Sequence, residues 1–265
     1  YKPIITVTVR GNSAQKEYNG QSQSVNGFNV SGIPADSGIS LKLKDGQKAE
    51  ASGINVGTYN MNLNADMFEV DYEGETYSAD NCIVRISEIT DGKLEITPKA
   101  VTVTAENKSK VYGDEDPELT ATKSGLLGND KVTYTLSREP GENVGTYTIT
   151  ASGEADQGNY TVTYRPGTLT INKRPVTLTS ATLSKEYDGT ALVNGETPLA
   201  TEEGWVEGEG ANYQFTGSVT LPGATAPNAY IYTAKEGTDF NNYSISYNEG
   251  QLSITSKEAK YEVQV

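Results

Sequence analysis

The stretch Lys110-Val111-Tyr112-Gly113-Asp114 opens a series of four landmarks that decides the fold of this chain. It is followed by Asn143-Val144-Gly145-Thr146-Tyr147, by the pair Asn159-Tyr160, and by Gly167-Thr168-Leu169-Thr170-Ile171. An order of landmarks that recurs three times indicates a tandem array. The looser copies are Lys16–Gly20, Asn55–Tyr59, Asn81–Ile86 and Gly92–Ile96 upstream, and Lys185–Gly189, Asn228–Tyr232, Asn242–Tyr247 and Gly250–Ile254 downstream.

Each copy begins with a segment in which apolar and polar residues alternate, as in Ile5-Thr6-Val7-Thr8-Val9. A period of two residues is typical of a half-buried strand. No segment of ten or more residues shows a helical period. The pattern predicts an all-β protein of three tandem small immunoglobulin-like β-sandwich modules. β-Grasp-like modules are the alternative, and they require an amphipathic helix.

The connections between the copies are short and contain proline, as in Thr97-Pro98-Lys99-Ala100. They predict repeat modules over residues 1–98, 99–173 and 174–257, with 258–265 as a junction or the start of a further strand. Four-residue connections are too short for loose tethers, so an elongated array is expected. The first module is diverged and has an insertion at about 66–80. Both ends resemble junctions, which suggests a piece of a longer array.

Composition excludes several classes of function. The formal net charge of -14 opposes binding to nucleic acid and to anionic membranes. The chain has no histidine, which removes histidine-based triads and the usual zinc sites. Cys82 is the only cysteine, so no intrachain disulfide forms, and its position predicts a small core residue. No apolar run approaches the length of a membrane span, and a monomer is expected.

The recurring signature residues are predicted to be structural. Tyr18, Tyr112 and Tyr187 are expected to plug the core of their own module, with the hydroxyl at the rim. Glycine follows each tyrosine, which predicts a turn with positive φ or a close backbone approach. These glycines are Gly20, Gly113 and Gly189.

Two constellations could carry chemistry. Asp114, Asp116 and Glu118 crowd one loop, where clustered oxygens can bind calcium. The spacing does not match an EF-hand, and the equivalent loops lack the cluster. A solvated acidic loop without a cofactor is therefore the favoured interpretation. Carboxylate pairs could also catalyse glycoside hydrolysis, but no pair recurs between modules, so an enzyme is not expected.

A third hypothesis concerns the lysines and asparagines that recur in register. Some protein modules join such a pair through an isopeptide bond, which needs a buried carboxylate nearby. No such carboxylate repeats, so a lysine lying along its sheet and an asparagine in a turn are the simpler interpretation. The residues concerned are Lys16, Lys110 and Lys185, and Asn81, Asn159 and Asn242.

The landmarks of the second copy, from Lys110 to Tyr160, resemble the YGX-type MBG repeat of bacterial surface proteins. Lys185-Glu186-Tyr187-Asp188-Gly189-Thr190 resembles the related YDG-type repeat, also found in adhesin-like proteins. The resemblance implies tandem modules of an extracellular, cell-surface or secreted bacterial protein. It implies no catalytic residue.

Two functions remain open on this basis. The modules are either a non-catalytic stalk whose partners are the neighbouring modules, or an adhesion module that binds glycans or host surface proteins. Aromatic side chains outside the repeated signature are the candidate ligand contacts, because aromatic faces stack on sugar rings. They are Trp205, Tyr72, Tyr77 and Phe68.

Overall fold

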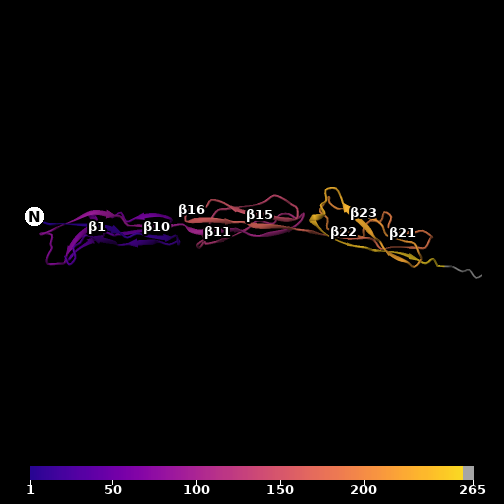
Figure 1. Cartoon of the computed structure of the whole chain (residues 1–265), viewed down its shortest axis with the longest axis horizontal. Helices are drawn as coiled ribbons and strands as arrows, with labels where there is room; N and C mark the ends of the chain where they lie inside the picture. The colour runs from indigo at the N-terminus through magenta and orange to yellow at the C-terminus, as the bar shows by residue number, and fades with distance from the viewer. Residues whose placement is uncertain (259–265) are drawn as a thin grey trace, which may run out of the picture. The chain divides into compact units, whose positions relative to one another are not determined.

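The computed structural model describes residues 1–258 (Figure 1). The junction or further strand expected over 258–265 therefore lies outside the described residues from residue 259 on. The prediction of an all-β protein is confirmed. Strands follow one another along the described chain, with two short 3-10 turns at Ala65–Met67 and Phe240–Asn242. The helix that a β-grasp module needs is absent from residues 1–258. Over the same residues no helix has the length and apolar character to cross a bilayer.

The chain divides into two compact units, each described here by itself. The first unit contains the first repeat and one sheet of the second repeat. The second unit contains the other sheet of the second repeat and the third repeat. Their residues are Tyr1–Thr104, Ala121–Thr135 and Ala151–Arg165 for the first, and Ala105–Thr120, Leu136–Thr150 and Pro166–Val265 for the second.

The first unit is built on strands β1 and β10, drawn in indigo and purple in Figure 1. The first repeat has two three-stranded sheets and two strand pairs. The sheets are β4 (Phe28–Ser31), β1 (Ile4–Gly11) and β9 (Ile83–Thr90), and β2 (Ala14–Glu17), β10 (Lys93–Thr97) and β7 (Gly57–Asn60). The pairs are β3 (Gln23–Asn26) with β6 (Glu50–Gly53), and β5 (Ile39–Leu43) with β8 (Phe68–Tyr72). The sheet from the second repeat is β13 (Ala121–Ser124), β11 (Lys99–Ala105), β17 (Tyr160–Arg165) and β16 (Asp156–Gln157).

The second unit has the same construction. Its sheet from the second repeat is β12 (Lys108–Val111), β18 (Gly167–Asn172), β15 (Gly145–Ser152) and β14 (Thr135–Arg138). The sheets of the third repeat are β22 (Thr201–Glu203), β19 (Arg174–Thr179) and β27 (Tyr243–Asn248), and β20 (Leu183–Glu186), β28 (Gln251–Thr255) and β25 (Thr225–Pro227). Its strand pairs are β21 (Leu192–Val193) with β24 (Ser218–Val219), and β23 (Ala211–Phe215) with β26 (Tyr230–Ala234).

One pairing rule holds in all three repeats. The first strand lies parallel to the penultimate strand, and the second strand lies parallel to the last one, as in β1 with β9 and β2 with β10. The first two strands of each repeat are thus hydrogen-bonded to its last two strands, one pair in each of the two sheets. The apolar positions of the Gly-x-Leu-x-Ile landmark lie at the centre of the second sheet, where Leu94, Leu169 and Leu252 are fully buried. This explains why that landmark is the best preserved of the four.

Part of the stretch expected as an insertion at 66–80 forms a regular strand. Residues 68–72 form β8, which pairs with β5 as β26 pairs with β23 in the third repeat. The stretch is therefore a regular strand of the first and third repeats. The second repeat instead has the single long strand β15 in this part of the chain.

The register of two landmarks also differs from the one predicted. Gly57 and Gly145 stand opposite Ile96 and Ile171, but the third repeat has Ala224 in that place, hydrogen-bonded to Ile254. Tyr230, the residue expected there, belongs to β26. Tyr230 lies after the interruption between β25 and β26, which corresponds to the interruption between β7 and β8 and which the sequence pattern does not mark.

The second shift lies in the first repeat. Ile86 pairs with Val7 as Val162 pairs with Val101, so the position of Tyr160 is occupied by Val84 rather than by Cys82. Cys82 lies two residues earlier. It is buried in the cluster of Ile5, Val7 and Ile39, as predicted for a core residue.

Candidate functional site: the junctions between repeats

Tyr112 does not plug the core of its own repeat. It follows β12 directly and packs against the buried cluster of the third repeat that contains Val176, Leu178 and Tyr243. Its ring meets Tyr243 edge-on, with 5.4 Å between centroids and an interplanar angle of 78°. Both hydroxyls donate to the carboxylate of Glu209, at 2.7 Å from Tyr112 and 2.6 Å from Tyr243. The predicted core plug is thus a contact between repeats.

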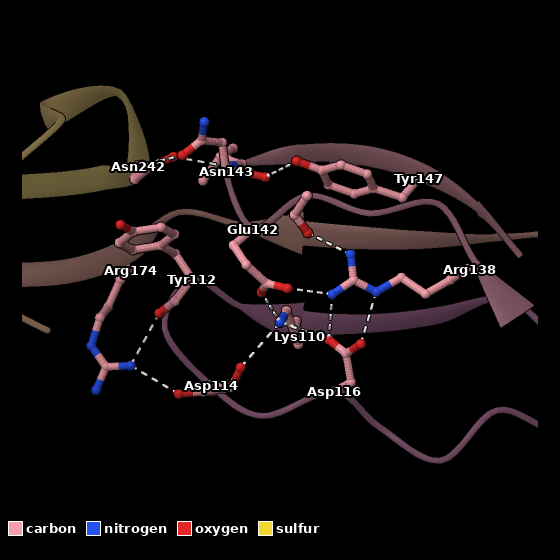
Figure 2. A network of polar contacts seen from close by, with 12 residues as sticks. Lys110, Tyr112, Asp114, Asp116, Arg138, Glu142, Asn143, Tyr147, Arg174 and Asn242 are labelled. Carbon is pink, nitrogen blue, oxygen red and sulfur yellow. Dashed lines mark hydrogen bonds and ion pairs between the residues drawn. The ribbon is translucent and has the colours of Figure 1, made fainter.

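An asparagine completes this contact. Asn242 is 2% exposed and precedes β27. Its Oδ1 accepts the backbone N–H of Val144 at 2.8 Å, and its Nδ2 donates to Oδ1 of Asn143 at 3.0 Å. Figure 2 shows Asn242 beside Asn143, while Tyr112 lies below them. We call Tyr112, Asn143, Glu209, Asn242 and Tyr243 the second junction.

The first unit contains the same arrangement, built from the first and second repeats. Tyr18 meets Tyr160 edge-on at 5.5 Å and 83°. Both hydroxyls donate to Asp130, at 3.3 and 2.5 Å. Asn159 Oδ1 accepts the N–H of Val56 at 2.9 Å, and its Nδ2 donates to Asn55 at 3.0 Å. We call Tyr18, Asn55, Asp130, Asn159 and Tyr160 the first junction.

The signature glycines lie in these contacts. Gly113 has φ +83°, and a Cβ there would come within 2.3 Å of a methyl group of Val206. Gly20 has φ +76°, and a Cβ there would lie 3.7 Å from a methyl group of Leu127, an ordinary van der Waals distance. At Gly113 the missing side chain lets the third repeat approach the backbone, whereas at Gly20 the positive φ is the reason for glycine.

A charged network lies beneath the second junction and is shown in Figure 2. The ammonium of Lys110, which is 8% exposed, donates to Asp116 at 2.7 Å, to the backbone oxygen of Asp114 at 3.1 Å and to Glu142. Arg138 forms ion pairs with Asp116 and Glu142 as well. Its guanidinium lies over the ring of Tyr147, 5.7 Å from the centroid.

Two of the three carboxylates predicted as calcium ligands, Asp114 and Asp116, therefore face cations of the protein. Asp114 pairs with Arg174 at 2.8 Å, and the same guanidinium donates to the backbone oxygens of Tyr112 and Gly204. Glu118 lies on the exposed surface. Among residues 1–258 no group of acidic side chains is arranged to hold a metal ion. Through the contacts of Asp114 and Tyr112 with Arg174, the loop connects the second repeat to the third.

The network shifts the pKa values of its members toward the charged forms. Hydrogen bonds from Arg138 and Lys110 lower the pKa of the Asp116 carboxyl, and bonds from Lys110 and Arg138 lower the pKa of Glu142. Burial alone would lower the pKa of Lys110, but its bonds to Asp116 and Glu142 outweigh burial and raise it. The three groups stay ionised at neutral pH.

The recurring lysines and asparagines do not meet. Lys16 donates to the backbone of Ser24, and Lys185 donates to Asp188, Thr190 and Ala191. Asn159 and Asn242 are engaged at the junctions instead. The geometry that an isopeptide bond between these residues needs is not found.

The aromatic residues predicted to contact a ligand lie in packing clusters. Phe68 is buried against Phe28, with 5.0 Å between centroids, while Tyr72 and Tyr77 pack on the Cys82 cluster. Trp205 is half-buried between Tyr243, at 4.7 Å, and Phe240, at 5.9 Å.

Sequence reasoning missed Asp130 and Glu209, the carboxylates that bind both tyrosines at a junction. A signal was present, because each lies five residues after the glycine of the preceding turn, Gly125 or Gly204. The residue type differs between the two copies, and the first repeat has Ser37 at this spacing. The position therefore does not stand out as a motif.

Comparison with known proteins gives one match. Residues 101–170 match the model of the MBG domain (YGX type), a non-catalytic module. Neither the curated proteins nor the solved structures contain a match to the chain. The matched residues include Tyr112, Asn143 and Asn159, so the part of the chain that resembles the MBG domain carries contacts of both junctions.

Proposed function

We propose that this chain is a non-catalytic spacer of an extracellular bacterial surface protein, in which each repeat is fixed against the next by a tyrosine–asparagine junction. The observation that carries the proposal is that one contact set is built twice. An aromatic pair, a shared carboxylate and an asparagine bonded to a backbone N–H occur at both junctions. A spacer needs defined orientation between modules, and these contacts supply it.

Two further observations support the proposal. The MBG match is to a non-catalytic module. The side chains considered as ligand contacts are also used in packing, since Phe68 is buried and Trp205 lies between Tyr243 and Phe240. Adhesion usually requires an exposed patch, so the spacer is favoured over a glycan- or host-protein-binding module.

Small-angle X-ray scattering of the intact chain tests the spacer. A compact domain of this length has a radius of gyration of about 18 Å, and the proposal expects a clearly larger value. Replacing Tyr18 and Tyr112 by serine should broaden the distribution of interatomic distances while circular dichroism keeps its β signal. A radius near the compact value would contradict the proposal.

A glycan array with the same chain tests the alternative. The spacer predicts no reproducible binding. Binding that is lost in a folded Tyr72→Ala or Trp205→Ala variant would favour an adhesion module.

A further inference from the structure

The third repeat presents the tyrosine half of a junction without an occupant among the described residues. Tyr187 follows β20 as Tyr18 follows β2 and Tyr112 follows β12. Its backbone N–H donates to Thr255 as those of Tyr18 and Tyr112 donate to Thr97 and Asn172. The backbone is thus held in the same way in all three copies. The side chain differs, because Tyr187 is 37% exposed and Tyr18 is 7% exposed.

The glycine of this copy shows the same openness. Gly189 has φ +86°, close to the value of Gly20. A Cβ at Gly189 would meet nothing within 4 Å, whereas one at Gly20 would face Leu127. Leu221, which is 69% exposed, precedes β25 at the same end of the sheet as Tyr187, because β25 runs antiparallel to β28 and β20 runs parallel to it. β28 lies between β20 and β25. Two large exposed side chains and an open backbone are therefore found at the same end of this sheet.

We propose that the end of this sheet at Tyr187 is a docking surface for a further repeat of the same kind, joined in tandem. That repeat carries a tyrosine and a carboxylate in the positions of Tyr160 and Asp130. Continuity with the two junctions identifies the occupant. In both of them the tyrosine after the second strand receives a second tyrosine, and one carboxylate accepts from both hydroxyls.

The groups that bind the asparagine of the next repeat are missing at this end of the sheet. The residue equivalent to Val56 and Val144 is Gly223, whose N–H donates to Ile254 within the repeat. Its predecessor is Pro222, where the other repeats have Asn55 and Asn143. The third docking surface therefore uses the tyrosine contact alone. It should hold its partner less firmly than the first and second junctions hold theirs.

The same comparison excludes the first repeat as the occupant. Val84 stands at the position of Tyr160, and Ser37 stands at the spacing of Asp130. Asn81 is engaged locally with Thr76 and Ser78. A second copy of this chain, docking through its first repeat, therefore lacks both hydroxyl and carboxylate.

The test extends residues 1–256 of the chain with a second copy of residues 99–173. Nitration of Tyr187 by tetranitromethane is followed by mass spectrometry of the peptide that contains it. The appended copy of residues 99–173 does not duplicate this peptide, so the signal reports Tyr187 alone. We expect its nitration rate to fall several-fold from the rate in the unextended chain, toward the rate of Tyr18. Asp130→Ala together with Tyr160→Ala in the appended copy should restore the original rate.

Two controls make the result decisive. A chain extended with residues 2–98 should leave the nitration of Tyr187 unchanged. Tyr160→Ala in the unextended chain should expose Tyr18, which shows that the reagent detects an opened junction. Unchanged nitration of Tyr187 after extension with 99–173, while Tyr18 stays protected, would overturn the proposal. Protection that rises with protein concentration in the unextended chain would also overturn it, since the occupant is then a second copy. The inference rests on the proposed spacer, but the scattering test does not involve Tyr187, so the two can fail separately.

Discussion

Tyr112 and Tyr243 come from different repeats, yet their rings meet edge-on at 5.4 Å and their hydroxyls share the carboxylate of Glu209. The same relationship joins Tyr18 and Tyr160 through Asp130. A residue that marks the repeat in the sequence therefore acts at its boundary. Substitutions at the junctions separate this role from a role within a single repeat.

Tyr112→Ala should weaken the second junction by about 1–3 kcal/mol, because it removes an aromatic pair and a hydrogen bond to a carboxylate. Amide exchange around β27 should accelerate, while exchange in the β18 core around Leu169 changes little. Tyr187→Ala is the matched control. It removes the same side chain from a more exposed site and should cost less than about 0.5 kcal/mol. Global loss of protection in the second repeat would instead restore the core-plug interpretation.

Asn242→Ala should cost about 1–3 kcal/mol, because the partly buried N–H of Val144 loses its acceptor. The exposed neighbour Asn241 provides the control, since alanine there leaves the junction intact. Faster exchange of the Val144 amide, measured by NMR, should appear only in the Asn242 variant. Equal effects of the two substitutions would show that the contact is not specific.

Asp116→Asn should lower the melting temperature, because it removes a charged partner of both Lys110 and Arg138. The expected cost is about 1–2 kcal/mol, reduced from that of a fully buried pair by the partial exposure of Asp116. Glu115→Gln, one residue earlier on the exposed surface, should have little effect. Calcium should not change the melting temperature of either protein, and a calcium-dependent rise lost in Asp116→Asn would contradict the role assigned to this loop.

Tyr230→Phe should leave stability unchanged or raise it by about 1 kcal/mol. The Tyr230 hydroxyl is buried and has no hydrogen-bond partner among the described residues, and burial raises its pKa to about 12. Removing an unpaired buried polar group relieves its desolvation cost. Tyr243→Phe is the counterpart, because its hydroxyl binds Glu209 and its loss should be destabilising. Thermal unfolding of the two variants should therefore shift in opposite directions, or only the Tyr243 variant should shift.

The second junction should loosen in alkali. The hydrogen bond to Glu209 and then burial raise the pKa of Tyr112, while burial and then Glu209 raise that of Tyr243. A raised pKa in the packed state means that the separated or unfolded state ionises first, at its ordinary value of about 10. The stabilisation is therefore present below about pH 10 and lost as the pH rises further. Amide exchange in β27, corrected for its intrinsic pH dependence, should show this loss, and Tyr112→Phe should reduce it.

The sequence by itself determined the class of the fold. Alternation such as Ile5-Thr6-Val7-Thr8-Val9 specifies which face of a strand is buried, because side chains alternate across a strand. The prediction holds in the structure, where Ile5, Val7 and Val9 are buried. The burial of Cys82 followed from the same argument, since it depends only on local pattern and neighbours.

Only the tertiary structure decided where the signature tyrosines point. Tyr112 lies just past the end of β12, so alternation no longer constrains its direction, and the approach of the next repeat at Gly113 places it against Tyr243. Likewise the break between β25 and β26 placed Ala224, not Tyr230, opposite Ile254. Glu209 and Asp130 became recognisable for the same reason. Their role depends on two hydroxyls that converge from different repeats, and residue spacing within one repeat does not encode that convergence.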